Sequence, residues 1–291
     1  MPISPAITIL GSRGGWHTDT LLHRCQQRGL SSSVIGWPEL GSEILTAGTQ
    51  FHPRPLEQTT AVLVRGMPSG TLEQVITRMN ILGQLNAAGR RVLNQPTALE
   101  TAIDKYLTIA RLASAGLPVP RTAVIQSAGD LRRFAEACGG TAVVKPLFGS
   151  NGHGLSLFSA TATELPEPLL TTGVALAQEP ISHDGWDVRI LLVGDEPFAM
   201  KRVACPGEWR TNIARGGKPY PFVAPADWID LARQAATTVG AELAGVDLLP
   251  SRDGAVWLLE VNAVPGWQAL QSVTSTDIAS AVLDLLVAGS V

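Results

Sequence analysis

The chain has 291 residues, of which 45% are hydrophobic and 16% are charged, and its formal net charge at pH 7 is −3. This length predicts two or three subdomains with a sizeable core, and the composition excludes a disordered chain. An acidic balance without a basic stripe argues against a nucleic-acid partner, and no apolar run is long enough to span a bilayer. Three cysteines without disulfide or metal-ligand spacing, and an N-terminus without a secretory signal, predict a cytoplasmic protein.

The first part of the chain alternates between strand and helix patterns. Strands are predicted at 6–10, 32–35, 61–64 and around 92–93, and helices at 18–28 and 71–88. This alternation predicts a small open α/β sheet. The glycine-rich turn at 11–15 lacks the full G-x-G-x-x-G spacing, which disfavours a dinucleotide site. Arg13 and Arg65, at strand ends, are instead predicted to help form a crevice for an anionic substrate.

Gln95 and Pro96 mark a boundary before the second part of the chain. Helices are predicted there at 101–115 and 130–137, and strands at 121–125, 142–146, 155–158 and 174–178. Lys145 is the one charged residue of an otherwise apolar strand. A lysine is rarely buried without a partner, so Lys145 either reaches a nucleotide phosphate, which we favour, or extends to solvent. The glycine-rich turn at 148–154 joins two strands, and its backbone N–H groups could cover phosphates.

The third part of the chain carries acidic residues on apolar strands. Strands are predicted at 187–193 and 197–203, helices at 227–239 and 278–287, and a polar, cationic functional loop at 209–217. An Asp-Gly turn at 253–254 predicts a hairpin that brings Asp247 beside Glu260 and Asn262. Because these oxygen donors share one face, we predict a Mg²⁺ site with room for phosphate oxygens. The alternative is an edge hairpin whose acids are solvated.

The order of these parts resembles the ATP-grasp superfamily, and within it the RimK-type glutamate ligases. The resemblance covers nearly the whole chain and rests on short motifs that are weak singly but strong in joint order. They are Asp104-Lys105, Val143-Val144-Lys145, the turn at 148–154, Gln178-Glu179, Asp187-Val188-Arg189, Arg210-Thr211-Asn212, Arg215-Gly216-Gly217, Gly245-Val246-Asp247, Glu260-Val261-Asn262 and Pro265-Gly266. The resemblance implies an ATP-grasp fold of α/β and α+β class. It consists of an N-terminal open α/β (pre-ATP-grasp) domain (1–96), a central subdomain (97–180) and a C-terminal subdomain (181–291), with ATP between the last two.

The resemblance also implies a role for each matching residue. Lys105 and Lys145 would contact nucleotide phosphates, and the linker that meets adenine would consist of Gln178, Glu179, Pro180 and Ile181. Asp187 would lie near the ribose, and Arg210 and Asn212 near the γ-phosphate and acyl phosphate. Magnesium would be bound by Asp247, Glu260 and Asn262. Arg210 and Lys145 would be the catalytic residues. Two positions depart from the family pattern. Pro180 lacks a backbone donor where an aromatic residue is common, and Trp267 follows the Pro-Gly turn where smaller aliphatic residues occur.

The expected activity is an ATP- and Mg²⁺-dependent carboxylate–amine ligase that proceeds through an acyl phosphate. Two Mg²⁺ ions are expected, with Mn²⁺ as an alternative. The added amino acid is expected to be L-glutamate, and the acceptor a carboxylate of a small-molecule cofactor or a protein terminus. Residues 64–68 and 72–75 look most like bacterial ligases associated with tetrahydromethanopterin-type cofactors, which suggests a pterin-type acceptor.

Several alternatives to this activity stay open at this point. Ribosomal-protein glutamylation and carrier-protein-dependent amino-acid biosynthesis fit the same resemblance. A non-catalytic ATP-binding regulatory protein is disfavoured because Lys145, Arg210 and the three metal-ligand candidates are all present. A nicotinamide oxidoreductase lacks its complete fingerprint. The linkage, the number of residues added and assembly into a homo-oligomer are not indicated by the residues.

Overall fold

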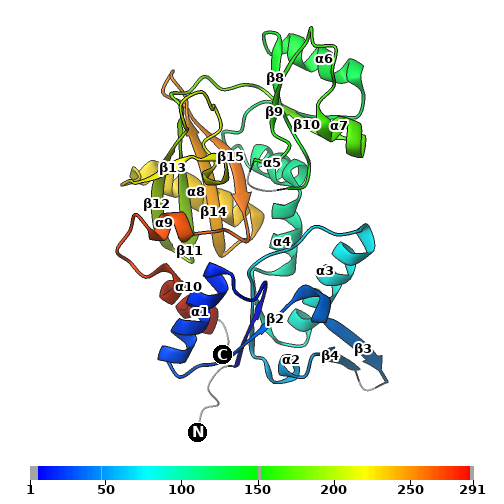
Figure 1. Ribbon diagram of the computed structural model, residues 1–291, viewed down its shortest axis with the longest axis vertical. Coiled ribbons are helices and arrows are strands. Elements are labelled where there is room, and N and C mark those ends of the chain that lie inside the picture. The colour runs from blue at the N-terminus through cyan, green and yellow to red at the C-terminus, as the bar shows by residue number, and fades with distance from the viewer. Residues whose placement is uncertain (1–5, 47, 150–151, 289–291) are drawn as a thin grey trace.

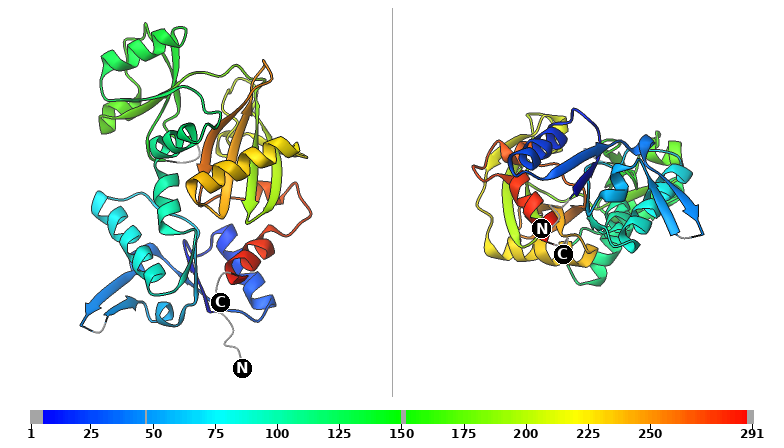
Figure 2. Two further views of the ribbon diagram at one scale, coloured as in Figure 1. Left: turned by 180° about the vertical axis from the view of Figure 1, so that it is seen from behind. Right: turned by 90° about the horizontal axis from the view of Figure 1, so that it is seen from below.

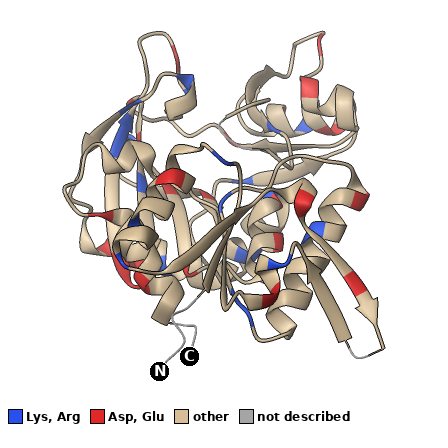
Figure 3. Ribbon diagram, turned by 60° about the horizontal axis from the view of Figure 1, so that its bottom comes forward, with Lys and Arg blue, Asp and Glu red and all other residues tan. Residues whose placement is uncertain are grey.

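The four sheets of the protein are seen in a computed structural model that describes residues 6–46, 48–149 and 152–288. Within these ranges the strands form sheets of four, four, five and two strands (Figure 1). The mixed α/β architecture confirms the predicted fold class. No helix in the described part of the chain is long and apolar enough to cross a membrane. Figure 3 shows basic and acidic residues interspersed over the elements rather than gathered in one basic stripe.

The N-terminal sheet is parallel, and its strand order reverses in the middle. Its order is β2 (Ser31–Ile35), β1 (Ala6–Leu10), β5 (Ala61–Val64) and β6 (Arg91–Leu93), with helices α1 (Trp16–Gln27) and α3 (Leu72–Ala87) following β1 and β5. Because β1 and β5 are neighbours at the reversal, the residues that follow them meet at the carboxyl edge. A Cβ added to Gly11 would lie 3.3 Å from Arg65 Cβ, so the two strand ends approach closely there and a larger residue would require Arg65 to shift.

The central sheet is antiparallel and has a hydrophobic core of its own. Its order is β7 (Thr122–Ile125), β10 (Ala175–Gln178), β8 (Thr141–Lys145) and β9 (Ser156–Ser159), and it packs against α6 (Ala128–Ala137), with α7 (Glu167–Thr172) beside β10. Ser127 caps α6 by accepting a hydrogen bond from Asp130 N. The core formed by Leu131, Val144, Phe158 and their neighbours contains no residue of the other sheets among those described.

The five-stranded sheet is antiparallel and buries side chains on both faces. Its order is β13 (Lys218–Pro221), β12 (Glu196–Val203), β11 (Trp186–Val193), β14 (Leu243–Pro250) and β15 (Val256–Asn262). Helix α8 (Ala226–Val239) packs on one face, and α10 (Ile278–Ala288) lies on the other, where it also contacts α1 and β5. Alternate residues of β11 therefore join two different clusters, Ile190 the first and Leu191 the second.

Both of these clusters include residues of the N-terminal sheet, so the N-terminal and five-stranded sheets are packed into one unit. Figure 2 shows the central sheet set apart from that unit. The buried side chain of Asn94, just after β6, strengthens the junction. Its Nδ2 donates to Leu243 O (2.7 Å) and Ala263 O (2.6 Å), and its Oδ1 accepts from Glu242 N and Leu243 N.

The structure differs from the predicted elements in several places. The helix predicted at 101–115 is two helices, α4 (Pro96–Ile103) and α5 (Lys105–Ser114), because Asp104 leaves helical geometry and caps α5 by accepting from Leu107 N. The first helix begins at Trp16 rather than at residue 18. Elements that were not predicted are η1 (Trp37–Glu39), β3 (Gly41–Leu45), β4 (Gly48–His52), α2 (Pro55–Gln58), α7, η2 (Ile213–Arg215), β13 and α9 (Gln268–Gln271). Ser150 and Asn151 of the predicted glycine-rich hairpin lie outside the described residues.

Candidate active site

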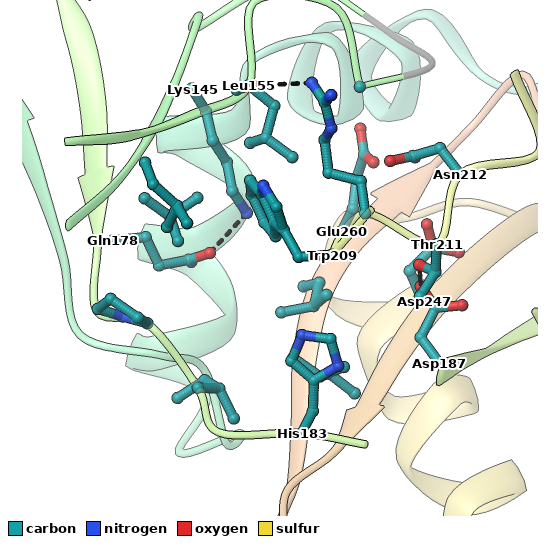
Figure 4. Close-up of a pocket in the computed structure, with 18 of the residues that line it drawn as sticks. Lys145, Leu155, Gln178, His183, Asp187, Trp209, Thr211, Asn212, Asp247 and Glu260 are labelled. Carbon is teal, nitrogen blue, oxygen red and sulfur yellow. Dashed lines mark hydrogen bonds between the residues drawn. The ribbon is translucent and has the colours of Figure 1, made fainter. Parts of the chain in front are cut away.

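A cavity of about 280 Å³ lies between the central sheet and the five-stranded sheet (Figure 4). Its walls come from β8, β10, the segment after β10, the loop after β12, and the paired strands β14 and β15. The predicted site residues that line it are Lys105, Lys145, Gln178, Glu179, Pro180, Ile181, Asp187, Arg210, Asn212, Asp247 and Glu260. Asn262 is not among the described residues that line the cavity. Residues far apart in the sequence thus meet at one place.

Lys145 ends β8 and points into the cavity rather than out to solvent (Figure 4). Its Nζ donates to Gln178 Oε1 at 2.5 Å, and Gln178 Nε2 in turn donates to Thr122 Oγ1 at 3.0 Å. Burial lowers the pKa of Lys145 to about 8, although the carboxylate of Glu260 acts in the opposite direction. Because Gln178 is neutral, this ammonium keeps its charge available for an anion in the cavity.

Lys105 connects three parts of the cavity wall. It is the first residue of α5, and its Nζ donates to Gly149 O in the glycine-rich turn at 2.5 Å. The same nitrogen lies 3.9 Å from Glu260 Oε1. Lys105 and Lys145 thus bring two ammonium groups to one cavity, as expected of a site for phosphates.

Two aspartates in the floor of the cavity are bonded to two arginines. Arg202 donates from Nε and Nη2 to the two carboxylate oxygens of Asp187 (2.7 and 2.6 Å), and its Nη2 lies 3.0 Å from Asp247 Oδ2. Arg189 donates from Nε and Nη2 to Asp247 (2.7 and 2.8 Å). Thr211 Oγ1 donates to Asp187 Oδ2, which connects this network to the loop after β12. Both oxygens of Asp187 are therefore already bonded, and the ribose contact expected of it stays a prediction.

The charges of this network compensate one another in a buried place. Asp187, Arg202 and Asp247 are 3%, 2% and 4% exposed. Burial by itself raises the pKa of Asp247, but Arg189 and Arg202 outweigh that effect and bring it to about 2. Burial lowers the pKa of Arg202, and Asp247 and Asp187 outweigh it, so the net shift is upward. Asp247 and Arg202 are consequently ionised at neutral pH.

The three predicted metal ligands lie together on β14 and β15. Asp247 pairs with Glu260 and Gly245 with Asn262, and the register shifts between Asp247 and Leu248. A carboxylate offers about four acceptor directions, so Asp247 keeps capacity beyond its three arginine bonds. No cluster of three or more His, Cys, Asp or Glu side chains that could hold a metal occurs among the described residues. The donors present, two carboxylates and an amide, fit a hard cation that takes further oxygens from a nucleotide.

Arg210 lines the same cavity as Lys145 and has a partner that the sequence did not indicate. Its Nε and Nη2 donate to Glu208 (2.9 and 2.7 Å), and its Nη1 donates to Leu155 O at 3.1 Å. Arg189, Arg202 and Glu208 are therefore additions to the predicted site, as are the cavity-lining Trp209 and His183. Arg189 and Arg202 lie on largely apolar strands, as Lys145 and Asp247 do, but each shares its strand with another charged residue and was therefore not singled out.

The two arginines predicted to form an anion crevice at the edge of the N-terminal sheet differ in how many of their N–H groups have partners. Arg13 is exposed and forms a salt bridge with Glu39, with Nη1 and Oε1 2.5 Å apart. Arg65 Nη2 donates to Pro265 O (2.9 Å), and its guanidinium carbon lies 4.2 Å from the centre of the Trp267 ring. Its Nε and Nη1 are buried with no hydrogen-bond partner among the described residues, and burial lowers the pKa of Arg65 to about 9.

His17 supports the turn that carries Trp267. The Nε2 atom of His17 accepts from Trp267 N (2.9 Å) and Gln268 N (3.2 Å), and the two rings meet edge to face. Burial and the charge of Arg65 lower the pKa of His17 to about 4, so the imidazole is neutral. Trp267 itself is 0% exposed, and this turn directly follows the strand of Glu260 and Asn262.

Known proteins share this fold. The chain superposes on the ATP-grasp ligase PsnB complexed with a minimal precursor with a TM-score of 0.78, over 99% of each chain at 22% identity. The RimK domain ATP-grasp protein from Sphaerobacter thermophilus superposes with a TM-score of 0.73, over 97% of this chain and 99% of that one at 20% identity. At such identities these structures establish the fold, which is that of the ATP-grasp ligases.

Sequence comparison identifies the family. Residues 102–286 match the RimK-like ATP-grasp domain. The probable alpha-L-glutamate ligase of Serratia proteamaculans is 33% identical over 291 residues, covering 96% of this chain and 95% of that protein. Tetrahydromethanopterin:alpha-L-glutamate ligase of Methanosarcina acetivorans is 36% identical over 209 residues, which cover 67% of this chain and 64% of that protein. The chain belongs to the RimK-like ATP-grasp family and is an ATP-dependent ligase that forms amide bonds.

Proposed function

We propose that this ligase joins the amino group of L-glutamate to the carboxylate of an acceptor through an acyl phosphate. The observation that carries the proposal is the meeting of Lys145, Arg210 and Glu260 around one cavity, from three separate parts of the chain. The glutamate ligases that are 33% and 36% identical to the chain support L-glutamate as the amine.

An amine cannot displace oxide from a carboxylate at a useful rate, so the carboxylate must first be given a better leaving group. An acceptor oxygen attacks the γ-phosphorus of ATP while the bond to the β,γ-bridging oxygen breaks and ADP leaves. The glutamate nitrogen then attacks the acyl carbon, loses a proton and expels phosphate. Together these two reaction steps balance all atoms and give ADP, phosphate and the amide.

The first step brings an anionic carboxylate against an anionic triphosphate. Two like charges ~4 Å apart cost about 4 kcal/mol at an effective dielectric near 20, and several such pairs act together. We assign Lys105 and Lys145 to the nucleotide phosphates and Arg210 with Asn212 to the transferring group, where a guanidinium can bind two oxygens at once. The segment from Gln178 to Ile181 would receive adenine, and Asp187 would lie near the ribose.

Magnesium is part of the proposal. Asp247, Glu260 and Asn262 are the proposed ligands, and one or two Mg²⁺ ions, or Mn²⁺, would reduce the negative charge of the phosphates. Mg and ADP are named in the PsnB complexes, which share the fold. The division into an N-terminal domain (1–96), a central subdomain (97–180) and a C-terminal subdomain (181–291) belongs to the same proposal, with ATP between the last two.

The acceptor that we propose is a small-molecule carboxylate, with a pterin-type cofactor as the first candidate. The name of the 36% identical relative, a tetrahydromethanopterin ligase, supports this choice. Arg65 supports an anionic acceptor at the edge of the N-terminal sheet, because its guanidinium keeps buried N–H groups without described partners. Precursor peptides, which are named with PsnB, are the second candidate class.

The test combines the purified protein with ATP, Mg²⁺, L-glutamate and candidate acceptors, and follows ADP and product mass. The acceptors would include tetrahydromethanopterin and peptides that end in glutamate. ADP release that requires both acceptor and glutamate, with a product one glutamyl residue heavier, supports the proposal. Tight ATP binding without ADP release under any of these conditions would refute it. Product fragmentation would then establish the linkage and the number of residues added.

A further inference from the structure

Arg210 is held by a carboxylate two residues before it. Both oxygens of Glu208 accept from the guanidinium, at 2.9 Å from Nε and 2.7 Å from Nη2. Glu208 is itself fixed by its own loop, since Oε1 also accepts from the backbone N–H groups of Trp209 and Arg210, each at 2.9 Å. Arg210 Nη1 donates to Leu155 O, directly before β9. The guanidinium thus makes three hydrogen bonds to two partners while lining the cavity.

The N–H groups of Arg210 that are not bonded to Glu208 or Leu155 determine how it can bind a ligand. A guanidinium carries five N–H groups in one plane. Glu208 takes the Nε–Nη2 edge, and Leu155 takes one N–H of Nη1. One N–H on each terminal nitrogen is left for a ligand in the cavity. Those two groups are the ones a phosphoryl oxygen would meet, and their direction depends on the bond to Glu208.

The other acids of the cavity show why such a support is needed. Arg210 has a long flexible side chain, and Glu260 and Asp247 line the same cavity. Without Glu208, the guanidinium would be attracted to these carboxylates, which are needed elsewhere, and would lose its defined direction. Glu208 is ionised throughout the working range, because its hydrogen bonds with Arg210 lower its pKa to about 2.

We propose that Glu208 is a positioning residue, which directs the free N–H groups of Arg210 at the phosphoryl group as it is transferred. This inference rests on the proposed function, in which Arg210 contacts that group. It differs from a general structural role in one respect. Glu208 would act on the rate of the phosphoryl step and not on the affinity for the nucleotide, since the proposed nucleotide contacts are made by other residues.

The test uses ATP, Mg²⁺, a carboxylate acceptor (tetrahydromethanopterin or a peptide that ends in glutamate, whichever supports turnover) and hydroxylamine in place of L-glutamate. Hydroxylamine attacks the activated acceptor carboxylate, which is captured as a hydroxamate. We expect Glu208→Gln to lower the rate of hydroxamate and ADP formation about a hundredfold, the size of a misplaced catalytic group. The dissociation constant for ADP with Mg²⁺, measured by calorimetry, should stay within about threefold of the unaltered protein. Glu208→Asp, which keeps the charge, should recover part of the rate.

Two controls distinguish a failure of the role of Glu208 from a failure of the proposed function. Asp284→Asn removes a carboxylate that forms the same kind of pair with Arg28 far from the cavity, and should leave the rate unchanged. In an Arg210→Ala background, Glu208→Gln should cause no further loss, because Glu208 acts through Arg210. An unchanged rate in Glu208→Gln, or a rate and an ADP affinity that fall together, would overturn the inference. An active Arg210→Ala variant, or an unaltered protein that forms neither product, would instead overturn the proposed function.

Discussion

Asp247 and Glu260 lie opposite each other on β14 and β15, yet their partners differ. Asp247 is 4% exposed, and its carboxylate binds Arg189 and Arg202. Glu260 is less buried and has, among the described residues, one ion pair, with Lys105 at 3.9 Å. The two proposed metal ligands therefore differ in what they contribute to the fold.

We expect Asp247→Ala to destabilise the protein and Glu260→Ala to inactivate it without destabilising it. Loss of Asp247 leaves the buried guanidinium of Arg202 and the partly buried one of Arg189 short of a counter-charge, which costs about 3–5 kcal/mol and lowers Tm by about 5–10 °C. Loss of Glu260 should change Tm by less than about 2 °C, because its pair is longer and more exposed. Thermal unfolding and ADP formation measure the two effects. Full turnover in Glu260→Ala would remove the metal assignment, and an unchanged Tm in Asp247→Ala would contradict the role of the arginine pairs.

Nucleotide affinity should weaken in alkaline solution. The pKa of Lys145 is lowered to about 8, so in the nucleotide-free protein this ammonium loses its proton as the pH rises through 8, whereas an ordinary lysine stays charged. Because the charged form binds phosphate, the affinity for ADP should fall above pH 8 by at most about tenfold per pH unit. Calorimetry between pH 7 and 9.5 measures it. Lys145→Arg is the control and should bind with little pH dependence, and a flat profile for the unaltered protein would argue against Lys145 as a phosphate ligand.

Acid should destabilise the fold through His17. Its pKa in the folded protein is about 4, below the ordinary 6.5, so the unfolded chain takes up the proton first as the pH falls. Stability from the neutral imidazole is therefore full above pH 6.5 and decreases towards pH 4. We expect a loss of about 1–2 kcal/mol, less than the full shift would imply because His17 is partly exposed. Urea unfolding at pH 7, 5.5 and 4.5 measures this loss. The free energy of unfolding of His17→Gln should depend less on pH over the same range. Equal slopes in both proteins would contradict the assignment.

Arg65→Met should affect the acceptor and not the fold. Methionine keeps most of the packing against Trp267 and removes the N–H groups that have no described partner, which offsets the lost bond to Pro265 O. The free energy of unfolding should change by less than about 1 kcal/mol, whereas KM for a carboxylate acceptor should rise about tenfold or more. KM for ATP is the internal control. An acceptor KM that does not change would make Arg65 a structural residue only.

Structural features that depend on residues close together in the chain were the ones best predicted from the sequence. The β14–β15 hairpin could be predicted because an Asp-Gly turn separates two apolar runs, and the central hairpin because glycines separate two others. Lys145 and Glu260 stood out as lone charges on apolar strands, and the structure places both at the cavity. Short-range patterns are sufficient for such features.

Features that depend on distant partners could not be predicted in this way. The pairing of Asp187 with Arg202 joins two strands in one sheet, and nothing in either strand alone specifies it. The break at Asp104 was missed because apolar residues continue at helical spacing through it, although aspartate is a good helix cap. Strands β3 and β4 were missed because their residues are mostly exposed and lack the usual alternation.

The separate core of the central sheet has a mechanical consequence. Every buried residue of that core lies between residues 125 and 177, whereas the other two large sheets share their buried clusters. Because neither hydrophobic interior contains any described residue of the other part, a change in the relative orientation of the two parts would expose neither core. Lys145 and Gln178 belong to the central sheet, whereas Glu260 and Asp247 belong to the five-stranded sheet. A change in that orientation would alter the distance between the ammonium of Lys145 and the carboxylate of Glu260, and with it the width of the cavity that both line.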